Sequence, residues 1–272
     1  MAVDTGSTAH PAAAGVGVVP ETGAVRQSLG VRAVVFDTDG VVTDSAPAHE
    51  TAWREAFDAC LVAAGRAPGF TPEDYRHWVD GRPRLDGAEA FLTGRGLFLP
   101  PGGRDDPPGT GTVAAVAARK EELFRQWLDR HRVAPWPGTV RLLRALGRQG
   151  VPCAAVSASR HATRALRSAG VLDLFAAVVD GAAARRLRLP GKPDPALFLE
   201  AVRRLGVPAR EAAVVEDAAV GVEAGRRGGF ALVVGVDRGG GPASRERLLR
   251  HGADRVVGDP GELLAASAPE EA

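Results

Sequence analysis

The stretch Val34-Val35-Phe36-Asp37-Thr38-Asp39-Gly40 indicates the fold, because an apolar run ends there in two carboxylates and a glycine. In a strand, Asp37 and Asp39 point to the same side, so both acids converge where the backbone leaves the sheet. Two like charges so close repel each other unless a cation or a proton intervenes, and carboxylate oxygens are suitable ligands for Mg²⁺. The pair therefore predicts a metal site. For this segment alone, a turn closed by aspartate side-chain hydrogen bonds is the alternative.

Length, charge and cysteine content exclude several classes of protein. With 272 residues, the chain can bury a sizeable core as one large domain or two unequal ones. Its 34 Lys and Arg against 33 Asp and Glu give a net charge of +1, and the basic residues are scattered, so we expect no nucleic acid partner. No uncharged apolar stretch is long enough to span a bilayer. Because the N-terminus does not resemble a secretory signal and the two cysteines lie far apart, we expect a cytoplasmic protein with no membrane partner.

Short apolar runs recur along the chain, with helical patterns between most of them. The runs fall near residues 31–36, 151–156, 176–179, 212–215, 230–236 and 255–257. Strands that alternate with helices form a parallel sheet covered on both faces, so we expect an α/β fold.

The first two runs are separated by about a hundred residues, far more than a crossover helix needs. Helical patterns occur in this gap at 48–64 and 116–132, and between them the Pro- and Gly-rich segment 99–111 should be a surface loop. An inserted helical domain fits the gap. Residues 1–30 have no periodic pattern and contain two prolines, which predicts a disordered leader.

Polar side chains follow three of the later apolar runs, at the strand ends where ligands bind in open α/β sheets. Ser157 follows 151–156, Lys192 lies in Gly191-Lys192-Pro193, and Glu216 with Asp217 follows 212–215. Each has an ordinary explanation, since Ser and Asp cap helices and turn lysines are usually exposed. Together with Asp37 and Asp39, however, they place chemistry-bearing groups at four strand ends, which independent accidents explain poorly.

In this order the segments resemble the four motifs of the haloacid dehalogenase-like superfamily of phosphotransferases. The matching stretches are DTDGVVTDS at 37–45, Val156-Ser157, Gly191-Lys192-Pro193 and Val215-Glu216-Asp217. The resemblance covers about residues 31 to 262 and implies a Rossmann-like parallel sheet core with an inserted α-helical cap domain. We expect a core at 31–45 and 135–264, a cap at 46–134 and a flexible tail at 265–272.

Within the superfamily, the chain looks like β-phosphoglucomutase-like proteins. The resemblance assigns substrate contacts to five residues of the cap and of the loop after the second strand: His49, Trp53, Arg84, Ser159 and Arg160. Asp80 stands where characterised mutases usually have a lysine, and His161 stands where they usually have an asparagine. Both positions face the substrate in the family, so these departures bear on which sugar is bound and whether the chain is a mutase.

The resemblance also implies a mechanism. Asp37 is the expected nucleophile, which forms an aspartyl-phosphate, and Asp39 is the expected general acid and base. Phosphate oxygens would be bound by the Ser157 hydroxyl, the backbone at Ala158 and the Lys192 ammonium. The expected cofactor is Mg²⁺, with ligands from Asp37, Glu216, Asp217 and the backbone carbonyl of Asp39.

The expected reaction is phosphoryl transfer on a small sugar phosphate, either to a sugar hydroxyl or to water. A phosphatase is the close alternative. A dehalogenase is disfavoured because the family's dehalogenases lack the second acid, and a non-catalytic binding protein is disfavoured because no motif residue is missing. We expect a monomer or a weak homodimer, with the cap moving about hinges near 44–47 and 133–137.

Overall fold

The computed structural model describes residues 29–103, 105–238 and 241–265. Apart from Leu29, Gly30 and Ala265, the expected leader and tail lie outside the described residues.

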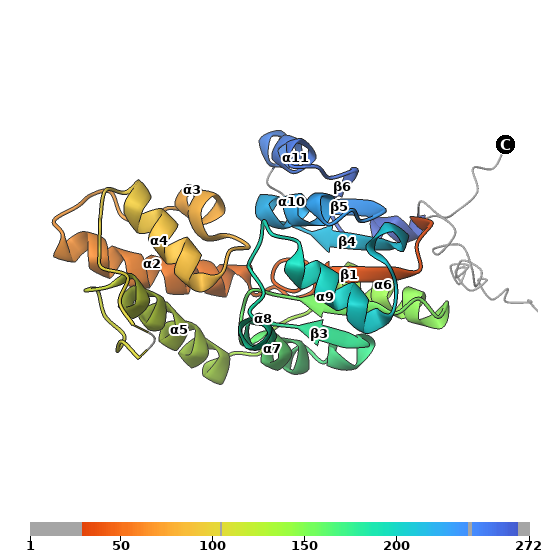
Figure 1. The fold of residues 1–272 in the computed structure, drawn as a ribbon, viewed down its shortest axis with the longest axis horizontal. Helices are drawn as coiled ribbons and strands as arrows, with labels where there is room; N and C mark the ends of the chain where they lie inside the picture. Colours follow the sequence, from red (N-terminus) through yellow and green to blue (C-terminus); the bar gives the residue numbers. More distant parts are fainter. Residues whose placement is uncertain (1–28, 104, 239–240, 266–272) are drawn as a thin grey trace, which may run out of the picture.

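A six-stranded parallel sheet forms one half of the molecule, with strand order β3-β2-β1-β4-β5-β6 (Figure 1). The strands are β1 (Ala33–Asp37), β2 (Cys153–Val156), β3 (Ala177–Val179), β4 (Ala212–Glu216), β5 (Leu232–Val236) and β6 (Arg255–Val257). The chain runs outward from β1 through β2 to β3 and then returns to β4 on the other side of β1. The carboxyl ends of β1 and β4 therefore meet at a topological switch point, where sheets of this kind bind ligands.

Both faces of the sheet are buried, which explains why most positions of its strands are apolar, rather than alternate positions only. Along β1, Val34 and Phe36 contribute to one hydrophobic cluster, whereas Ala33 and Val35 contribute to the other. Helices α6 (Pro137–Arg148), α7 (Ala162–Ser168) and α12 (Glu262–Ala265) supply the first cluster. The second includes residues of α8 (Gly181–Leu187), α9 (Ala196–Leu205), α10 (Ala219–Arg227) and α11 (Gly241–Arg250).

The chain between β1 and α6 forms a separate helical unit beyond one end of the sheet (Figure 1). It contains α2 (Ala46–Ala63), α3 (Pro72–Asp74), the π-helix η1 (Tyr75–Val79), α4 (Arg84–Gly94) and α5 (Val113–Arg130). Its own hydrophobic cluster is rich in aromatic rings, with Phe57 between Trp53 and Phe91 at ring-centre distances of 4.7 and 4.1 Å. The α/β fold with an inserted helical unit is therefore confirmed.

The two connecting segments that join this helical unit to the sheet lie side by side. The Asp44 amide donates to the Ala134 carbonyl at 2.9 Å, and Thr43 forms an isolated bridge with Pro135. Close by, Phe124 and Leu128 of α5 share a small cluster with Ala165 of α7. A paired connection and an apolar contact are thus among the contacts that join the helical unit to the sheet half.

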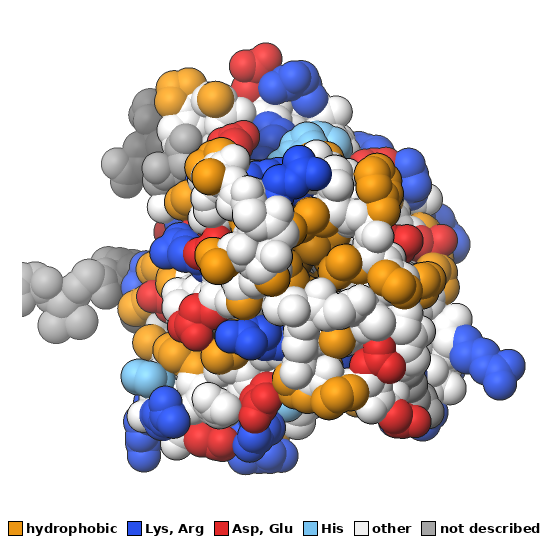
Figure 2. Space-filling view, turned by 90° about the vertical axis from the view of Figure 1, so that its left-hand side faces the viewer, with side chains coloured by type: hydrophobic (Ala, Val, Ile, Leu, Met, Phe, Trp, Pro, Cys, Tyr) orange, Lys and Arg blue, Asp and Glu red, His pale blue; other side chains and the backbone are white. Residues whose placement is uncertain are grey.

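The helices expected at 48–64 and 116–132 correspond to α2 and α5, and the segment 99–111 contains no helix or strand among its described residues. Helix α4 has no counterpart in the expectation. In the part of the chain that the structure describes, no helix combines the length and hydropathy needed to cross a membrane. On the face shown in Figure 2, charged side chains of both signs are interspersed.

Candidate active site

Asp37 and Lys192 form the centre of the site, at the switch point between β1 and β4. Lys192 Nζ makes an ion pair with Asp37 Oδ1 and donates to Glu216 Oε2 at 2.8 Å. The other oxygen of Asp37, Oδ2, accepts a hydrogen bond from the Asp39 amide at 2.9 Å. The Lys192 and Glu216 side chains are each only 1% exposed, so water screens these charges little.

This burial changes the protonation of each partner. Burial lowers the pKa of Lys192, but the Asp37 and Glu216 carboxylates outweigh that effect and raise it, so the ammonium stays charged. Burial also raises the pKa of Asp37, and the negative charge of Glu216 raises it further, while Lys192 opposes both effects. One ammonium is therefore held between two carboxylates that it cannot both neutralise.

A third carboxylate makes this excess of negative charge larger. Oxygen atoms of Asp37, Glu216 and Asp217 all lie within 4.8 Å of one another. Burial raises the pKa of Asp217 well above its usual value, as do the charges of its acidic neighbours. Against the single ammonium of Lys192, three carboxylates leave two negative charges uncompensated, and this donor set of hard oxygens fits a divalent cation such as Mg²⁺.

Gly40 allows Asp217 to approach the first motif. It adopts a φ of +86°, and a side chain at this position would overlap the Asp217 carboxylate. The glycine that ends the Asp-Thr-Asp-Gly segment is thus required both for its backbone conformation and for the close approach of the metal-site acid.

Asp39 turns away from these carboxylates and accepts hydrogen bonds from a different set of groups. Its Oδ1 receives Ser45 Oγ at 2.5 Å and lies 3.3 Å from His49 Nε2, while its Oδ2 receives Ser157 Oγ at 2.9 Å. Burial raises the pKa of Asp39, but His49 and the two hydroxyls outweigh it and hold the pKa well below its usual value. Asp39 is therefore an ionised carboxylate in this arrangement.

Lys120 of α5 fixes the orientation of the His49 ring. Lys120 Nζ lies 2.7 Å from His49 Nδ1, and the ring stacks on Phe124 with 3.8 Å between ring centres. An ammonium donates only, so Nδ1 accepts and the proton of the neutral ring lies on Nε2, which faces Asp39. Burial and the Lys120 charge lower the pKa of His49, and burial lowers the pKa of Lys120 to about 8.

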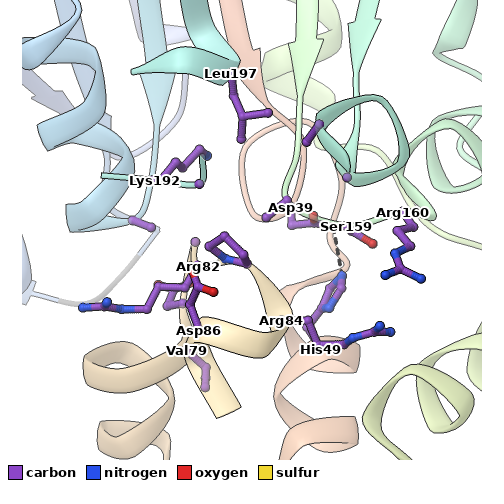
Figure 3. A pocket seen from close by; sticks show the side chains of 18 of the residues that line it. Asp39, His49, Val79, Arg82, Arg84, Asp86, Ser159, Arg160, Lys192 and Leu197 are labelled. Carbon is purple, nitrogen blue, oxygen red and sulfur yellow. Dashed lines mark ion pairs between the residues drawn. The ribbon is translucent and has the colours of Figure 1, made fainter. Parts of the chain in front are cut away.

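A cavity of about 250 Å³ extends from Asp37 to the helical unit. Figure 3 shows Lys192 and Asp39 on its sheet side, His49 and Arg84 on its helical side, and Arg160 extending toward the same region as Arg84. Arg84 Nη1 forms an ion pair with Glu121 Oε2, whose other oxygen lies 3.1 Å from His161 Nε2. The far end of the cavity therefore holds cationic groups suited to a second anionic group.

Asp80, which follows η1, also lines this cavity. Burial and, after it, the negative charge of Asp37 raise its pKa to about 6. A carboxylate thus occupies the part of the helical unit that faces the acidic cluster.

Comparison with known proteins decides the family. A family model described as a haloacid dehalogenase-like hydrolase matches residues 31–229. The chain belongs to this family.

Relatives that resemble this haloacid dehalogenase-like chain include two beta-phosphoglucomutases. The protein from Mycobacterium bovis is 41% identical over 240 residues, which cover 86% of this chain and 92% of the relative. The protein from Bacillus subtilis is 30% identical over 244 residues, with coverages of 89% and 95%. Among solved structures, a beta-phosphoglucomutase from Clostridium difficile gives a TM-score of 0.68 at 23% identity and covers 86% of this chain and 93% of its own, which supports the fold.

The structure brings most of the expected residues of this haloacid dehalogenase-like chain around one cavity. The lining includes Asp37, Asp39, His49, Trp53, Arg84, Ala158, Ser159, Arg160, Lys192, Glu216 and Asp217. Two side chains have partners that were not expected. The Ser157 hydroxyl donates to Asp39 and accepts from the Ser159 amide at 2.9 Å, and Trp53, only 4% exposed, stacks on Phe57. The three-carboxylate group does not include the Asp39 side chain, and the expectation for its backbone carbonyl stays a prediction.

Sequence reasoning missed Lys120 and Glu121. A signal existed for Lys120, because on a helix it shares a face with Ala117, Phe124 and Leu128, all of which are buried. A lysine on an apolar stripe needs a buried partner, and His49 is that partner.

Arg238, which follows β5, was also missed. Its guanidinium donates to the Gly40 carbonyl at 2.7 Å and the Val41 carbonyl at 3.1 Å, and it lies over the Trp136 ring at 3.9 Å. Arg238 therefore holds the turn that carries Asp39 against the connection leading into α6.

Proposed function

We propose that this chain transfers a phosphoryl group from a sugar phosphate by way of an aspartyl-phosphate on Asp37. The observation that carries this proposal is the environment of Asp37. Its carboxylate ends the central strand, is oriented by the Lys192 ammonium and the Asp39 amide, and opens on a cavity whose far end holds Arg84 and Arg160. The names of the two relatives agree with a sugar phosphate as substrate.

In the first step, a carboxylate oxygen of Asp37 forms a bond to phosphorus while the bond to the leaving sugar oxygen breaks. The leaving oxygen keeps the electron pair and takes a proton from Asp39. Lys192, held beside Asp37, neutralises charge on the transferring phosphoryl oxygens. When bound by Asp37, Glu216 and Asp217, with the Asp39 carbonyl as a further ligand, Mg²⁺ supplies additional stabilisation of that charge.

In the second step, the acceptor oxygen attacks phosphorus, Asp39 takes its proton, and the bond to Asp37 breaks. The arrangement seen here suits this step, because Ser45, Ser157 and His49 stabilise Asp39 as an anion. For the first step Asp39 must carry a proton, and its protonation is favoured when it loses part of these contacts, because they stabilise the anion.

Ser45 and His49 lie where the chain enters the helical unit, so movement of that unit would change the hydrogen bonds of Asp39. We propose that residues 46–134 act as a cap on a core formed by 31–45 and 135–264. The hinges would be the paired connections near 44–47 and 133–137. The cap would then determine whether a sugar hydroxyl or water is the acceptor.

A phosphatase acting on sugar phosphates is the second candidate, and Asp80 favours it. A carboxylate here adds negative charge to a cavity that would have to admit two phosphates in a mutase reaction. Ser159 and the backbone at Ala158 would bind phosphate in either reaction.

A panel of sugar phosphates tests the proposed function. It should include β-glucose 1-phosphate with a 1,6-bisphosphate primer, with phosphate release and isomerisation followed by phosphorus NMR. We expect turnover of at least one sugar phosphate, loss of turnover on exhaustive chelation, and recovery with Mg²⁺. Turnover that survives chelation would contradict the metal assignment, and inactivity on every phosphate ester would contradict the proposed function.

A further inference from the structure

Glu121 joins an arginine and a histidine that come from different parts of the fold. It lies on α5, its Oε2 forms an ion pair with Arg84 of α4, and its Oε1 lies 3.1 Å from Nε2 of His161, the residue before α7. All three side chains are between 20% and 24% exposed, so the contacts are shielded from water without being sealed.

Glu121 is ionised in this position. Burial raises its pKa, but His161 and Arg84 outweigh burial and lower the pKa to about 2. A carboxylate anion therefore occupies the cationic end of the cavity opposite Asp37.

Glu121 does not satisfy all the donors around it. Among the described residues, the buried Arg84 Nε has no hydrogen-bond partner. Burial lowers the pKa of Arg84, and the nearby positive charge of Arg160 lowers it further, against the opposing effect of Glu121. The guanidinium thus has donor capacity that one carboxylate does not use, whereas a phosphate offers more acceptor oxygens in a form that guanidinium groups bind well.

We propose that Glu121 is an internal carboxylate ligand of this cationic end and competes there with the distal phosphate of a bisphosphorylated substrate. The proposal rests on the proposed function, because it takes Asp37 as the site of the phosphoryl group that reacts. A distal phosphate either separates Glu121 from Arg84 and His161 or binds the unused donors beside them, and in both positions the Glu121 carboxylate is a like charge that disfavours it.

Glu121 thereby sets a preference between classes of substrate. A distal hydroxyl group can donate to the carboxylate and leave the ion pairs in place, whereas a distal phosphate dianion has no proton to donate and is repelled by the carboxylate. The cavity consequently favours sugar monophosphates whose far end carries hydroxyls, and it binds a bisphosphate more weakly than its arginines alone would allow.

The test measures binding without turnover, in an Asp37→Asn background. Calorimetry gives the Kd of β-glucose 1,6-bisphosphate and the Kd of phenyl phosphate, which carries no second anion. Glu121→Gln removes the charge at constant size and should lower the ratio of the bisphosphate Kd to the phenyl phosphate Kd by about tenfold.

Glu122→Gln is the matched control, because it removes a like charge from the adjacent position of α5 and is not among the residues that line the cavity in the described part of the chain. Its ratio should equal that of the parent. Glu121→Ala, a second variant in case the amide disturbs folding, should shift the ratio in the same direction as Glu121→Gln.

A ratio that stays the same or rises in the Glu121 variants would overturn the proposal, since Glu121 would then be inert or would hold Arg84 in place for the ligand. Absence of bisphosphate binding in both parent and variant would overturn it too. Failure of the proposed function is distinguishable, because it appears as inactivity of the unmodified protein on every phosphate ester, whatever the binding ratio.

Discussion

The two ends of the cavity are built differently. At the sheet end, Asp37 and Glu216 are the last residues of β1 and β4, Lys192 lies in the turn between α8 and α9, and all three charges are almost fully buried. At the helical end, Arg84 and Glu121 come from two different helices and keep partial contact with water. The sheet end has an excess of negative charge that calls for a cation, whereas the helical end pairs its own cations with a carboxylate.

This difference suggests that the sheet end of the cavity serves the reaction itself and that the helical end serves substrate selection. Strand ends in a parallel sheet are held in register by backbone hydrogen bonds, so the groups that we propose to react with phosphorus have little freedom. The groups at the helical end depend on how helices pack against one another, and a change of one side chain there alters what the cavity accepts. Substitutions at the sheet end should therefore affect all substrates alike, and substitutions at the helical end should affect them unequally.

The largest effect is expected from Asp37→Asn. An amide of equal size is neither a nucleophile nor an anionic ligand, so turnover of every phosphate ester should fall by roughly 10⁴-fold or more. Steady-state assays alongside circular dichroism would check that the fold is intact. Asp173→Asn, an exposed control, should behave like the parent. Retention of more than about a tenth of the parent rate would contradict the nucleophile assignment, because loss of a nucleophile costs far more.

Arg84→Ala should separate the substrates. Loss of the guanidinium should reduce kcat/KM for a bisphosphate-primed mutase reaction by about 10²-fold, because a charge-assisted pair with the second phosphate is lost. Hydrolysis of a small aryl phosphate, which has no second anion, should change far less. Arg76→Ala, an exposed arginine of the same helical unit, is the control. Equal losses of kcat/KM on both substrates would mean that Arg84 acts on every substrate alike. That result would contradict the different roles expected for the two ends of the cavity.

Arg238→Ala tests how rigidly the sheet end is held. Its hydrogen bonds to the Gly40 and Val41 carbonyls would be lost, which should reduce the free energy of unfolding by about 1–3 kcal/mol. It should also lower kcat more than it changes KM, since Asp39 is carried by the same turn. Arg226→Ala removes a comparable guanidinium contact to the Gly252 carbonyl, far from Asp39 in the fold, and should leave kcat unchanged. An effect on kcat of the same size in both variants would speak against a positioning role.

The smallest effect concerns the stability that Glu121 contributes. Its pKa of about 2 lies below the ordinary value of 4.5, so its contribution is fully present above pH 4.5 and is lost as the pH falls toward 2. Glu121→Gln should therefore lower the free energy of unfolding by about 1 kcal/mol at pH 7. Denaturant titrations should show this difference shrinking below pH 4.5, with Glu122→Gln as the control. A difference that does not vary with pH would mean that packing rather than charge is responsible.

The sequence predicted the sheet end well for a physical reason. Asp37 and Glu216 end neighbouring parallel strands, whose carboxyl ends meet at one edge, so their meeting follows from topology. Lys192 was expected at a strand end, but it lies in the turn between α8 and α9 and reaches both carboxylates from there. The sequence did not predict that Ser157 and Ser45 both donate to Asp39, because those contacts depend on the path of the loops.

The helical end was predicted less completely. The family pattern pointed to Arg84 and to position 161, but the ion pair of Arg84 with Glu121 depends on the packing of α4 against α5, which local spacing does not encode. Helix α4 itself was missed. Its apolar residues Ala88, Phe91 and Leu92 are followed by a glycine and give little periodic signal over eleven residues.

Trapping the covalent intermediate tests directly whether Asp37 carries the phosphoryl group during turnover. The protein is mixed with a reactive sugar phosphate and Mg²⁺, quenched in acid during turnover, digested and examined by mass spectrometry. We expect a phosphoryl group on the peptide that contains Asp37, removable by hydroxylamine as an acyl phosphate. A phosphoryl group on any other residue, or sustained turnover with no labelled peptide at any quench time, would contradict it.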